Sequence, residues 1–294
     1  MSQTIGIIGI GRMGRAICER LSGRGWTVLA TDRRAEREAE AMEAGARWVP
    51  ELGAVLDGAD LLVTVLPETD ALEEVAAAII PALRREATWI DMTTAAPERG
   101  SKLMEQAQRL GGECLVCTLG GGTDEARAGT LQLFVGGAPA AVDRHRPLLE
   151  ALGTTEHVGD HRSAYLSKLL VNALWFAQAV ALGEALVLAA REGVGPETLL
   201  GAIGRSAAGG ELVRQHGAAL LEGDYLASYG LDRCCDQLRA VVELATQRGV
   251  PCELSATVRD VYRDALERYG AVDGELLAVA RIEERAGVRL AGDS

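Results

Sequence analysis

The chain has 294 residues, enough for two domains, and 48% of them are hydrophobic, which is sufficient for a large buried core. Its net charge of −12 and its pI near 4.9 exclude the basic surface that binding to a nucleic-acid backbone requires. A predicted strand begins at Thr4, which leaves no room for a signal peptide, so we expect a cytoplasmic protein.

A glycine-rich turn follows this first strand. Residues 4–8 form an apolar run, a helical pattern covers 15–21, and Gly9-x-Gly11-x-x-Gly14 lies between them. In such a turn the first glycine allows a tight bend, the second lets the backbone approach a pyrophosphate, and the third lets the helix pack on the strand. The N–H groups at the helix start then face the phosphates. The alternative is a turn without a ligand, but the context favours a dinucleotide site.

An acidic residue, Asp32, ends the next predicted strand, residues 27–31. The distance from the glycine turn is typical of an acid that accepts a hydrogen bond from the adenosine ribose. A carboxylate there repels a 2′-phosphate, which favours NAD. Arg33 and Arg34 follow directly and are able to bind a 2′-phosphate, so NADP stays possible.

Strands and helices alternate over the rest of the first half. Helical patterns occur at 35–44, at 70–83 and after Pro97, and apolar strands are predicted at 60–66, 88–91, 113–118, 131–135 and 156–158. Strands that are apolar throughout are typical of a parallel sheet covered on both faces. We therefore expect the α/β class, with a Rossmann-type doubly wound parallel sheet in a cofactor-binding domain over residues 1–159.

Strand signals end after Gly159, and helical periodicity continues to the C-terminus, which predicts an all-helical domain over residues 160–294. Its first helix, about 163–191, is apolar nearly all round and needs cover on every side. Polar residues spread along it argue against a membrane span. We expect a second subunit to cover part of it.

The six cysteines give no sign of a metal or redox site. Cys114 and Cys117 fall on one predicted strand, where their side chains would face opposite sides. Without a second cysteine pair or nearby histidines, a zinc set is incomplete. We expect buried thiols and no metal.

Lys168 and Asn172 lie four residues apart on the long helix, hence on one face. Desolvation lowers the pKa of a lysine in apolar surroundings, which lets it exchange protons near neutral pH. Periodicity alone leaves open a lysine whose stem packs while its ammonium reaches water, and an asparagine that only bridges helices. Lys168 is thus a candidate general acid and base, and Asn172 a candidate ligand of a substrate hydroxyl.

Five motifs along nearly the whole chain resemble the β-hydroxyacid dehydrogenase family, the group of 3-hydroxyisobutyrate dehydrogenase and tartronate semialdehyde reductase. They are Gly9-Ile10-Gly11-Arg12-Met13-Gly14, Val65-Leu66-Pro67, the segments 91–97 and 121–131, and Lys168-x-x-x-Asn172. The resemblance implies reversible hydride transfer between NAD(P) and a small hydroxy acid or related alcohol. It also implies a helical domain like the C-terminal part of 6-phosphogluconate dehydrogenase, forming a homodimer or homotetramer.

The resemblance also assigns roles to residues. It implies a catalytic Lys168, a substrate-positioning Asn172, and substrate contacts from Thr94 and the loop Gly120-Gly121-Gly122. The implied cofactor contacts are Gly9, Gly11, Arg12, Met13, Gly14, Asp32, Arg33, Leu66, Pro67 and Thr94.

The chain departs from the family pattern at three places. Gly120 replaces a serine that binds the substrate carboxylate, and losing such a donor costs about 1–3 kcal/mol, although three backbone N–H groups can still form an anion nest. Arg162 and Tyr165 interrupt a glycine-rich approach to Lys168, either as replacement substrate contacts or as a solvated helix start. Cys235 stands where the family has a lysine near the cofactor. The sequence does not name the substrate.

Two alternative functions stay open. An imine or ketimine reductase shares the two-domain plan but typically lacks the lysine, so Lys168 argues against it. A catalytically inactive NAD(P)-binding scaffold would be consistent with the altered glycine loop, although the titratable group of the site is intact.

Overall fold

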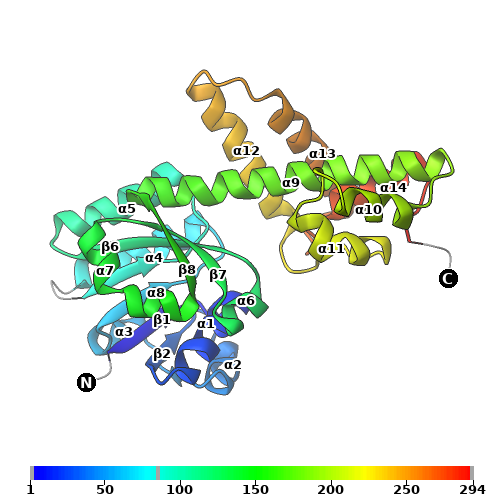
Figure 1. Ribbon diagram of the computed structural model, residues 1–294. Helices are drawn as coiled ribbons and strands as arrows, with labels where there is room; N and C mark the ends of the chain where they lie inside the picture. Colours follow the sequence, from blue (N-terminus) through cyan, green and yellow to red (C-terminus); the bar gives the residue numbers. More distant parts are fainter. Residues whose placement is uncertain (1–2, 84–86, 292–294) are drawn as a thin grey trace. The chain divides into compact units, whose positions relative to one another are not determined.

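The computed structural model describes residues 3–83 and 87–291 (Figure 1). It consists of two compact units, Met1–Lys168 and Leu169–Ser294. This division falls inside the long helix α9 (His161–Arg191), whereas the sequence places a domain boundary after Gly159. That boundary stays a prediction.

The first unit is built on one sheet, which within the described residues has eight strands in the order β3-β2-β1-β4-β5-β6-β7-β8. Strands β1 and β4 pair in parallel, and β2 lies on the other side of β1, so the strand order reverses there. In open sheets of this kind, ligands bind beyond the carboxyl ends of the strands at such a reversal. The strands are β1 (Thr4–Ile8), β2 (Thr27–Thr31), β3 (Arg47–Trp48), β4 (Leu61–Thr64), β5 (Thr88–Asp91), β6 (Glu113–Gly120), β7 (Leu131–Gly136) and β8 (Gly153–Gly159).

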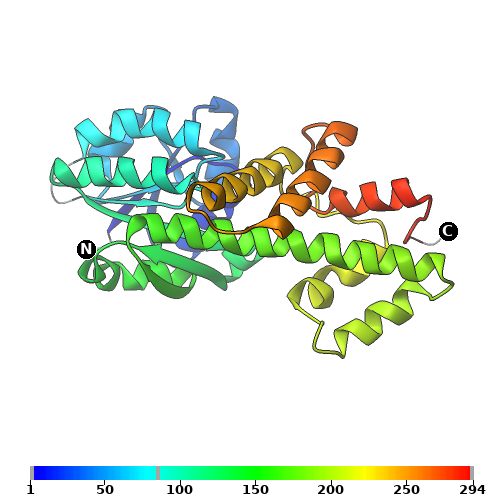
Figure 2. The ribbon, with the colours of Figure 1, turned by 90° about the horizontal axis from the view of Figure 1, so that it is seen from above.

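Helices cover both faces of this sheet (Figures 1 and 2). On one face Ile5, Ile7 and Val63 pack with α1 and α8, and on the other Leu62 and Trp89 pack with α4 and α5. The expected doubly wound architecture is therefore confirmed. The helices are α1 (Arg12–Gly23), α2 (Glu38–Glu43), α3 (Leu52–Gly58), α4 (Thr69–Ala82), α5 (Pro97–Arg109), α6 (Thr123–Ala128), α7 (Pro139–Arg144) and α8 (Arg146–Leu152), with a short 3₁₀ turn at Ala35–Arg37.

The sheet is mostly parallel, and one pair differs from the expectation. The neighbouring strands β3, β2, β1, β4, β5 and β6 all run parallel. Strands β6 and β7 are antiparallel, and β8 pairs parallel with β7. The connection 121–130 between β6 and β7 is shorter than the dozen or more residues that a parallel crossover needs. The sequence did not predict β3, because a strand of two residues has no periodic pattern. It predicted only the second half of β8, because the first half contains polar threonines.

The second unit is all-helical, as the sequence predicts. In Figure 2, α10 and α11 lie on one side of its part of α9, and α12 to α14 lie on the other. Two buried clusters share this helix: Leu182 and Leu186 pack with α11, and Phe176 and Val180 pack with α12 and α13. Besides α9, the helices are α10 (Pro196–Gly204), α11 (Glu211–Leu221), α12 (Leu231–Gln247), α13 (Glu253–Tyr269) and α14 (Leu277–Ala286).

One face of α9 is exposed in the single chain. Its apolar side chains there include Leu174 and Leu188, each 64% exposed, and Leu170, 44% exposed. By length and composition α9 also meets the criteria for a membrane span, with a mean hydropathy of 1.7. The remaining faces of its second half pack in the two clusters of the helical unit.

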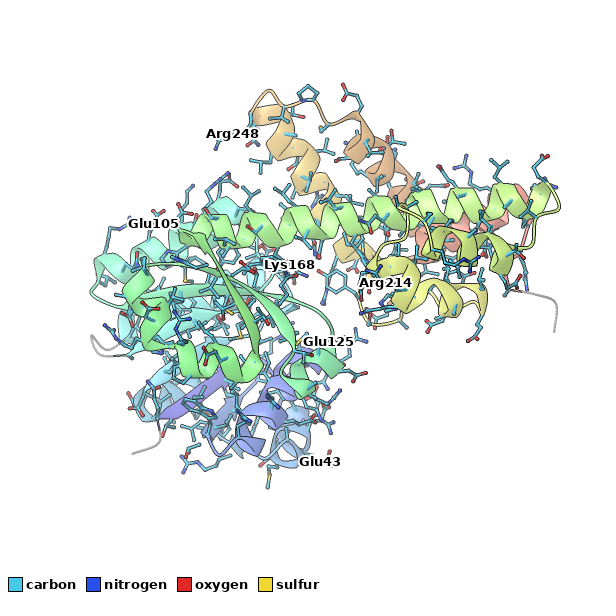
Figure 3. The ribbon with its side chains drawn as sticks, in the orientation of Figure 1. Glu43, Glu105, Glu125, Lys168, Arg214 and Arg248 are labelled. Carbon is cyan, nitrogen blue, oxygen red and sulfur yellow. The ribbon has the colours of Figure 1, made fainter. Side chains whose placement is uncertain are left out.

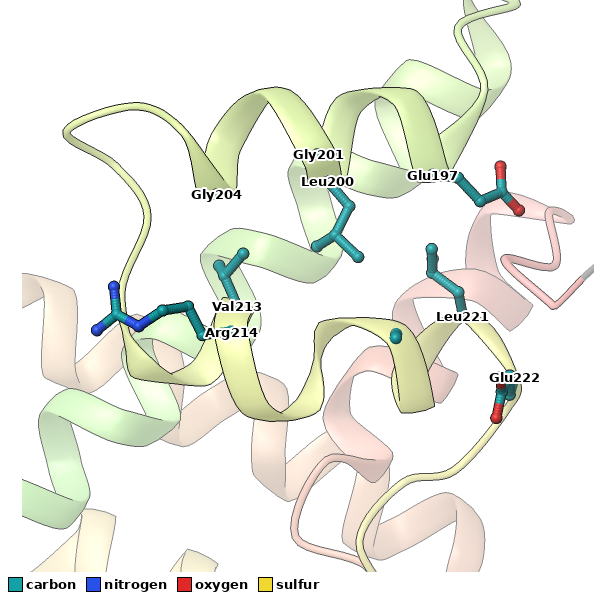
Figure 4. Close-up of a pocket in the computed structure, with 9 residues that line it drawn as sticks. Glu197, Leu200, Gly201, Gly204, Val213, Arg214, Leu221 and Glu222 are labelled. Atoms are coloured by element: carbon teal, nitrogen blue, oxygen red, sulfur yellow. The ribbon is translucent and has the colours of Figure 1, made fainter.

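A pocket of about 500 Å³ lies between α10 and α11 (Figure 4). Leu200 and Val213 line it, with Glu197 and Arg214 at its edges. A Cβ on Gly217 would lie 2.8 Å from the Leu200 side chain, so this glycine lets the two helices approach. None of the residues that line the pocket is a predicted site residue.

Candidate functional site

The turn after β1 has the geometry that a pyrophosphate-binding turn needs. Gly9 has φ +101°, and a Cβ there would lie 2.4 Å from the Val65 carbonyl oxygen. A Cβ on Gly14 would lie 2.0 Å from the Gly9 oxygen, so a larger residue would push α1 off the strand. Gly11 occupies the N-cap of α1, and a Cβ there would meet nothing within 4 Å. The helix start thus faces open space, which fits a dinucleotide phosphate.

Asp32 fastens the end of β2 to this turn. One carboxylate oxygen accepts a hydrogen bond from the Ile10 N–H at 2.7 Å, and the other accepts one from the Arg34 N–H at 3.0 Å. The Asp32 side chain is only 8% exposed. Arg33, by contrast, is largely exposed and lies 3.9 Å from the Glu74 carboxylate. The sequence did not predict this structural role of the acid.

A buried carboxylate, Asp91, lies at the carboxyl end of β5. Its Oδ1 accepts hydrogen bonds from the Thr64 hydroxyl at 2.6 Å and from the Thr93 N–H at 3.3 Å. Its Oδ2 accepts a hydrogen bond from the Tyr165 hydroxyl at 2.6 Å. Burial raises the pKa of Asp91 to about 6, although these hydrogen bonds act in the opposite direction.

The predicted cofactor turns lie next to this carboxylate. The hydroxyl of Thr93 accepts a hydrogen bond from the Leu66 N–H at 3.2 Å, which ties the turn after β5 to the turn after β4. Thr94, the next residue, is partly exposed, and Pro67 is exposed. These predicted residues thus follow the carboxyl ends of adjacent parallel strands, at the same edge as the glycine turn.

The glycine loop after β6 differs from the expected nest of three backbone amides. The Gly122 N–H already donates to the Glu125 carboxylate at 2.9 Å, in a box that caps α6. Gly121 has φ +112°, which favours glycine at that position. Because Glu125 occupies one amide and adds a negative charge beside it, the loop offers an anion less than the sequence suggested.

The first turns of α9 are held by the sheet. The Thr118 hydroxyl on β6 donates to the Ala164 carbonyl at 3.0 Å, and the His161 ring lies 2.9 Å from the Cys114 carbonyl. Arg162 pairs with Glu98 at 2.7 Å. Tyr165 is 1% exposed, so neither a solvated helix start nor a direct substrate contact fits it. Lys168, one turn further along α9, is partly buried (Figure 3).

Asn172 belongs to the second unit. Its amide N–H donates to the Gln237 side-chain oxygen at 2.8 Å, and the Gln237 amide donates to the Tyr229 hydroxyl. Gln237, on α12, is 8% exposed. Sequence reasoning missed this partner, although a glutamine on the buried face of an amphipathic helix is a signal that could have found it.

Two family models cover most of the chain. Residues 4–161 match the NAD-binding domain of 6-phosphogluconate dehydrogenase, and residues 163–282 match the NAD-binding domain of NADP-dependent 3-hydroxyisobutyrate dehydrogenase. The 3-hydroxyisobutyrate dehydrogenase of Pseudomonas aeruginosa is 31% identical over 70% of this chain and 70% of its own length. The chain belongs to the β-hydroxyacid dehydrogenase family.

Further relatives agree with this family. The 2-(hydroxymethyl)glutarate dehydrogenase of Eubacterium barkeri is 27% identical over 98% of this chain and 97% of its own. A structure of Mycobacterium tuberculosis 3-hydroxyisobutyrate dehydrogenase with L-serine has the same fold, with a TM-score of 0.85, 21% identity, and coverage of 96% and 99%. The chain is therefore an NAD(P)-dependent oxidoreductase of the type that acts on CH–OH groups.

Cys235 adds no positive charge to this dehydrogenase. Cys235 is partly buried, and burial raises the pKa of its thiol to about 11, so it is neutral at pH 7 and does not supply the positive charge of the family's lysine. Cys114 and Cys117 are free and buried. Over residues 3–83 and 87–291, no group of three histidine, cysteine or acidic side chains is placed to hold a metal ion.

Proposed function

We propose that the chain catalyses the reversible oxidation of a small hydroxy acid or related alcohol to the carbonyl compound, with Lys168 as general base and general acid. The observation that carries this is the attachment of α9 at the carboxyl ends of β5 and β6, one turn before Lys168. The predicted cofactor residues follow the carboxyl ends of β1, β2, β4 and β5. An amine beside that edge is within the region where such sheets bind their ligands.

In this mechanism Lys168 removes the hydroxyl proton of the substrate during oxidation and returns it during reduction. Asn172, whose amide is oriented by Gln237, holds the same oxygen. Bound NAD(P) supplies the acceptor or donor of the hydride. Thr94 and Gly120 to Gly122 contact the polar end of the substrate, without the hydroxyl that the family's serine provides.

We further propose NAD as the preferred cofactor, with Asp32 accepting the ribose 2′-OH. Oδ2 of Asp32 accepts the Ile10 N–H and keeps a second lone pair, whereas Oδ1 accepts the Arg34 N–H and lies 3.5 Å from the Arg34 Nε. A 2′-phosphate would bring its charge against this largely buried carboxylate. Arg33 supports the alternative, because its long exposed contact with Glu74 is easily exchanged for a phosphate. Comparing kcat/KM for NAD and NADP decides between them, and a higher value with NADP would contradict this preference.

The chain offers a matched test of the lysine, because it contains only two, Lys102 and Lys168. Lys102 is exposed on α5. We expect Lys168→Met to lower kcat by about 10²–10⁴-fold and Lys102→Met to leave it unchanged. Suitable substrates are 3-hydroxyisobutyrate, 2-(hydroxymethyl)glutarate and a set of short alcohols and amines, assayed with both cofactors. A Lys168→Met enzyme within a few-fold of the wild type would remove this residue from the mechanism.

The same assay separates the alternatives. Turnover of amines with no turnover of alcohols would favour an imine reductase. Tight cofactor binding with no turnover of any substrate would favour an inactive scaffold.

We also propose a cytoplasmic homodimer or homotetramer in which the exposed face of α9 contacts a second copy.

A further inference from the structure

Asp91 joins three segments of the candidate site through one carboxylate. Thr64 ends β4 and precedes the turn that contains Leu66. Thr93 belongs to the turn after β5, and Tyr165 belongs to α9. The Trp89 indole N–H donates to the Thr64 hydroxyl at 3.0 Å, which directs the hydroxyl proton of Thr64 toward Asp91. The carboxylate is completely buried, so each of these bonds forms without competition from water.

Tyr165 also fits its surroundings by shape. Its ring lies against α5 where Gly100 leaves room for it: a Cβ on Gly100 would lie 2.6 Å from the Tyr165 ring carbon Cε2. The ring and the hydroxyl are therefore fixed independently, one by packing and the other by Asp91. Tyr165 precedes Lys168 by three residues, so the two side chains are neighbours along one face of α9.

We propose that Tyr165, held by Asp91, is a positioning residue that fixes the start of α9, and with it Lys168, relative to the turns after β4 and β5. The inference rests on the proposed role of Lys168. It depends only on contacts within the first compact unit, which includes Lys168. Tyr165 does not contact the reacting atoms in this proposal and acts through the helix that carries the lysine.

Catalysis is sensitive to such a contact, because a displacement of about 1 Å in a reacting group can lower the rate about 100-fold. The other contacts of this helix start join it to different segments. The buried His161 ring lies 2.9 Å from the Cys114 carbonyl. Thr118 binds a main-chain carbonyl, and Arg162 is a partly exposed ion pair. The bond to Asp91 joins the helix directly to the segment containing Thr93 and Thr94.

The first test removes only the hydroxyl. We expect Tyr165→Phe to lower kcat by about 10-fold or more, with the KM for the cofactor changed less than twofold. The primary isotope effect on kcat, measured in the reduction direction with reduced cofactor deuterated at the transferred position, should rise because the chemical step becomes slower. The matched control is Tyr262→Phe, since Tyr262 is equally buried and donates one hydrogen bond at 2.8 Å, to the Glu275 carbonyl in the helical unit.

A second variant disturbs the packing of the Tyr165 ring and leaves its hydroxyl in place. Gly100→Ala keeps every hydrogen-bonding group but places a methyl group against the Tyr165 ring. We expect the same fall in kcat and the same rise in isotope effect. If Tyr165→Phe does not fold, this variant carries the test.

A readout that does not depend on turnover uses the small number of lysines. In a Lys102→Arg background, the rate of Lys168 acetylation by acetic anhydride is measured by mass spectrometry, apart from the N-terminal amine. We expect Tyr165→Phe to change this rate at least threefold and Tyr262→Phe to leave it unchanged. Wild-type kcat and labelling in Tyr165→Phe, or equal losses in both tyrosine variants, would overturn the positioning role. An active Lys168→Met enzyme would instead overturn the proposed mechanism. The labelling experiment would still test the positioning role, because it measures the reactivity of Lys168 in proteins that retain this lysine.

Discussion

The buried carboxylate of Asp91 makes the stability of the first unit depend on pH. Its pKa is raised from the ordinary value of 3.8 to about 6, because burial penalises the charged form. The folded chain therefore holds this proton at pH values where the unfolded chain has lost it. By linkage, the contribution of Asp91 to the free energy of unfolding falls as pH rises from about 4 to about 6, and it stays low above that range.

The magnitude follows from the two pKa values. A difference of about two pKa units corresponds to about 3 kcal/mol at neutral pH and above, with about half of this already present at pH 5. Between pH 5 and pH 8 the wild type should thus lose about 1 kcal/mol through this residue alone. Tyr165 and Cys117 do not offset the change, because burial raises the pKa of both groups and keeps them neutral.

The perturbation is Asp91→Asn, which removes the titration and retains an oxygen acceptor. The free energy of unfolding in urea is measured for both proteins from pH 5 to pH 8 by tryptophan fluorescence, since Trp26, Trp48 and Trp89 lie in the first unit. The variant is disturbed at every pH, because an amide N–H replaces one acceptor oxygen. The difference between variant and wild type, however, should shift by about 1 kcal/mol in favour of the variant over this range. A difference that stays constant within about 0.5 kcal/mol would refute the reasoning.

Two further predictions concern the substrate loop and the helical unit. Gly120→Ser supplies a hydroxyl where the loop lacks one and should raise kcat/KM for carboxylate substrates by about 5–150-fold, the equivalent of about 1–3 kcal/mol. A Cβ on Gly120 would lie 3.3 Å from the Gln132 Cβ, a tight fit that a small shift relieves. An unchanged kcat/KM would count against this loop as the carboxylate site. Leu174→Asp combined with Leu188→Asp places two charges on the exposed face of α9 and should convert the oligomer to a monomer in light scattering. The control is Leu254→Asp, which should leave the oligomer intact, because Leu254 lies on α13 and is 68% exposed. A wild-type mass for the double variant would contradict the proposed contact.

The fold was predictable where its cause is local. The glycine turn, the apolar strands and the long helix each leave a period or a spacing in the sequence, and the structure has all of them. The direction of β7 leaves no such signal, because strand direction depends on how the chain returns through 121–130. The length of that connection is the sequence feature that indicates an antiparallel pair. The prediction of a uniformly parallel sheet did not take it into account.

The site was predictable to a lesser degree. The sequence proposes Lys168, Asn172 and the residues after the strands as site residues, because these types at these spacings suggest a chemistry. It did not identify the partners that orient them, such as Gln237 for Asn172 and Glu125 for Gly122. Gln237 lies 65 residues from Asn172, so its place on a buried helix face predicts a hydrogen bond but not which residue is its partner. The bond from Gly122 to Glu125 depends on the turn that begins α6.

Asp91 shows why a buried acid is retained despite its cost at neutral pH. Three donors from three segments converge on it, and two carboxylate oxygens accept all of them. An asparagine offers one acceptor oxygen and adds two N–H groups that need partners of their own, and a serine is too short to span the distance from β5 to Tyr165. Leaving even one of these buried donors unsatisfied costs about 1–3 kcal/mol, comparable to the penalty of burying the charge. A carboxylate is therefore the side chain that holds the turns after β4 and β5 and the start of α9 in one arrangement.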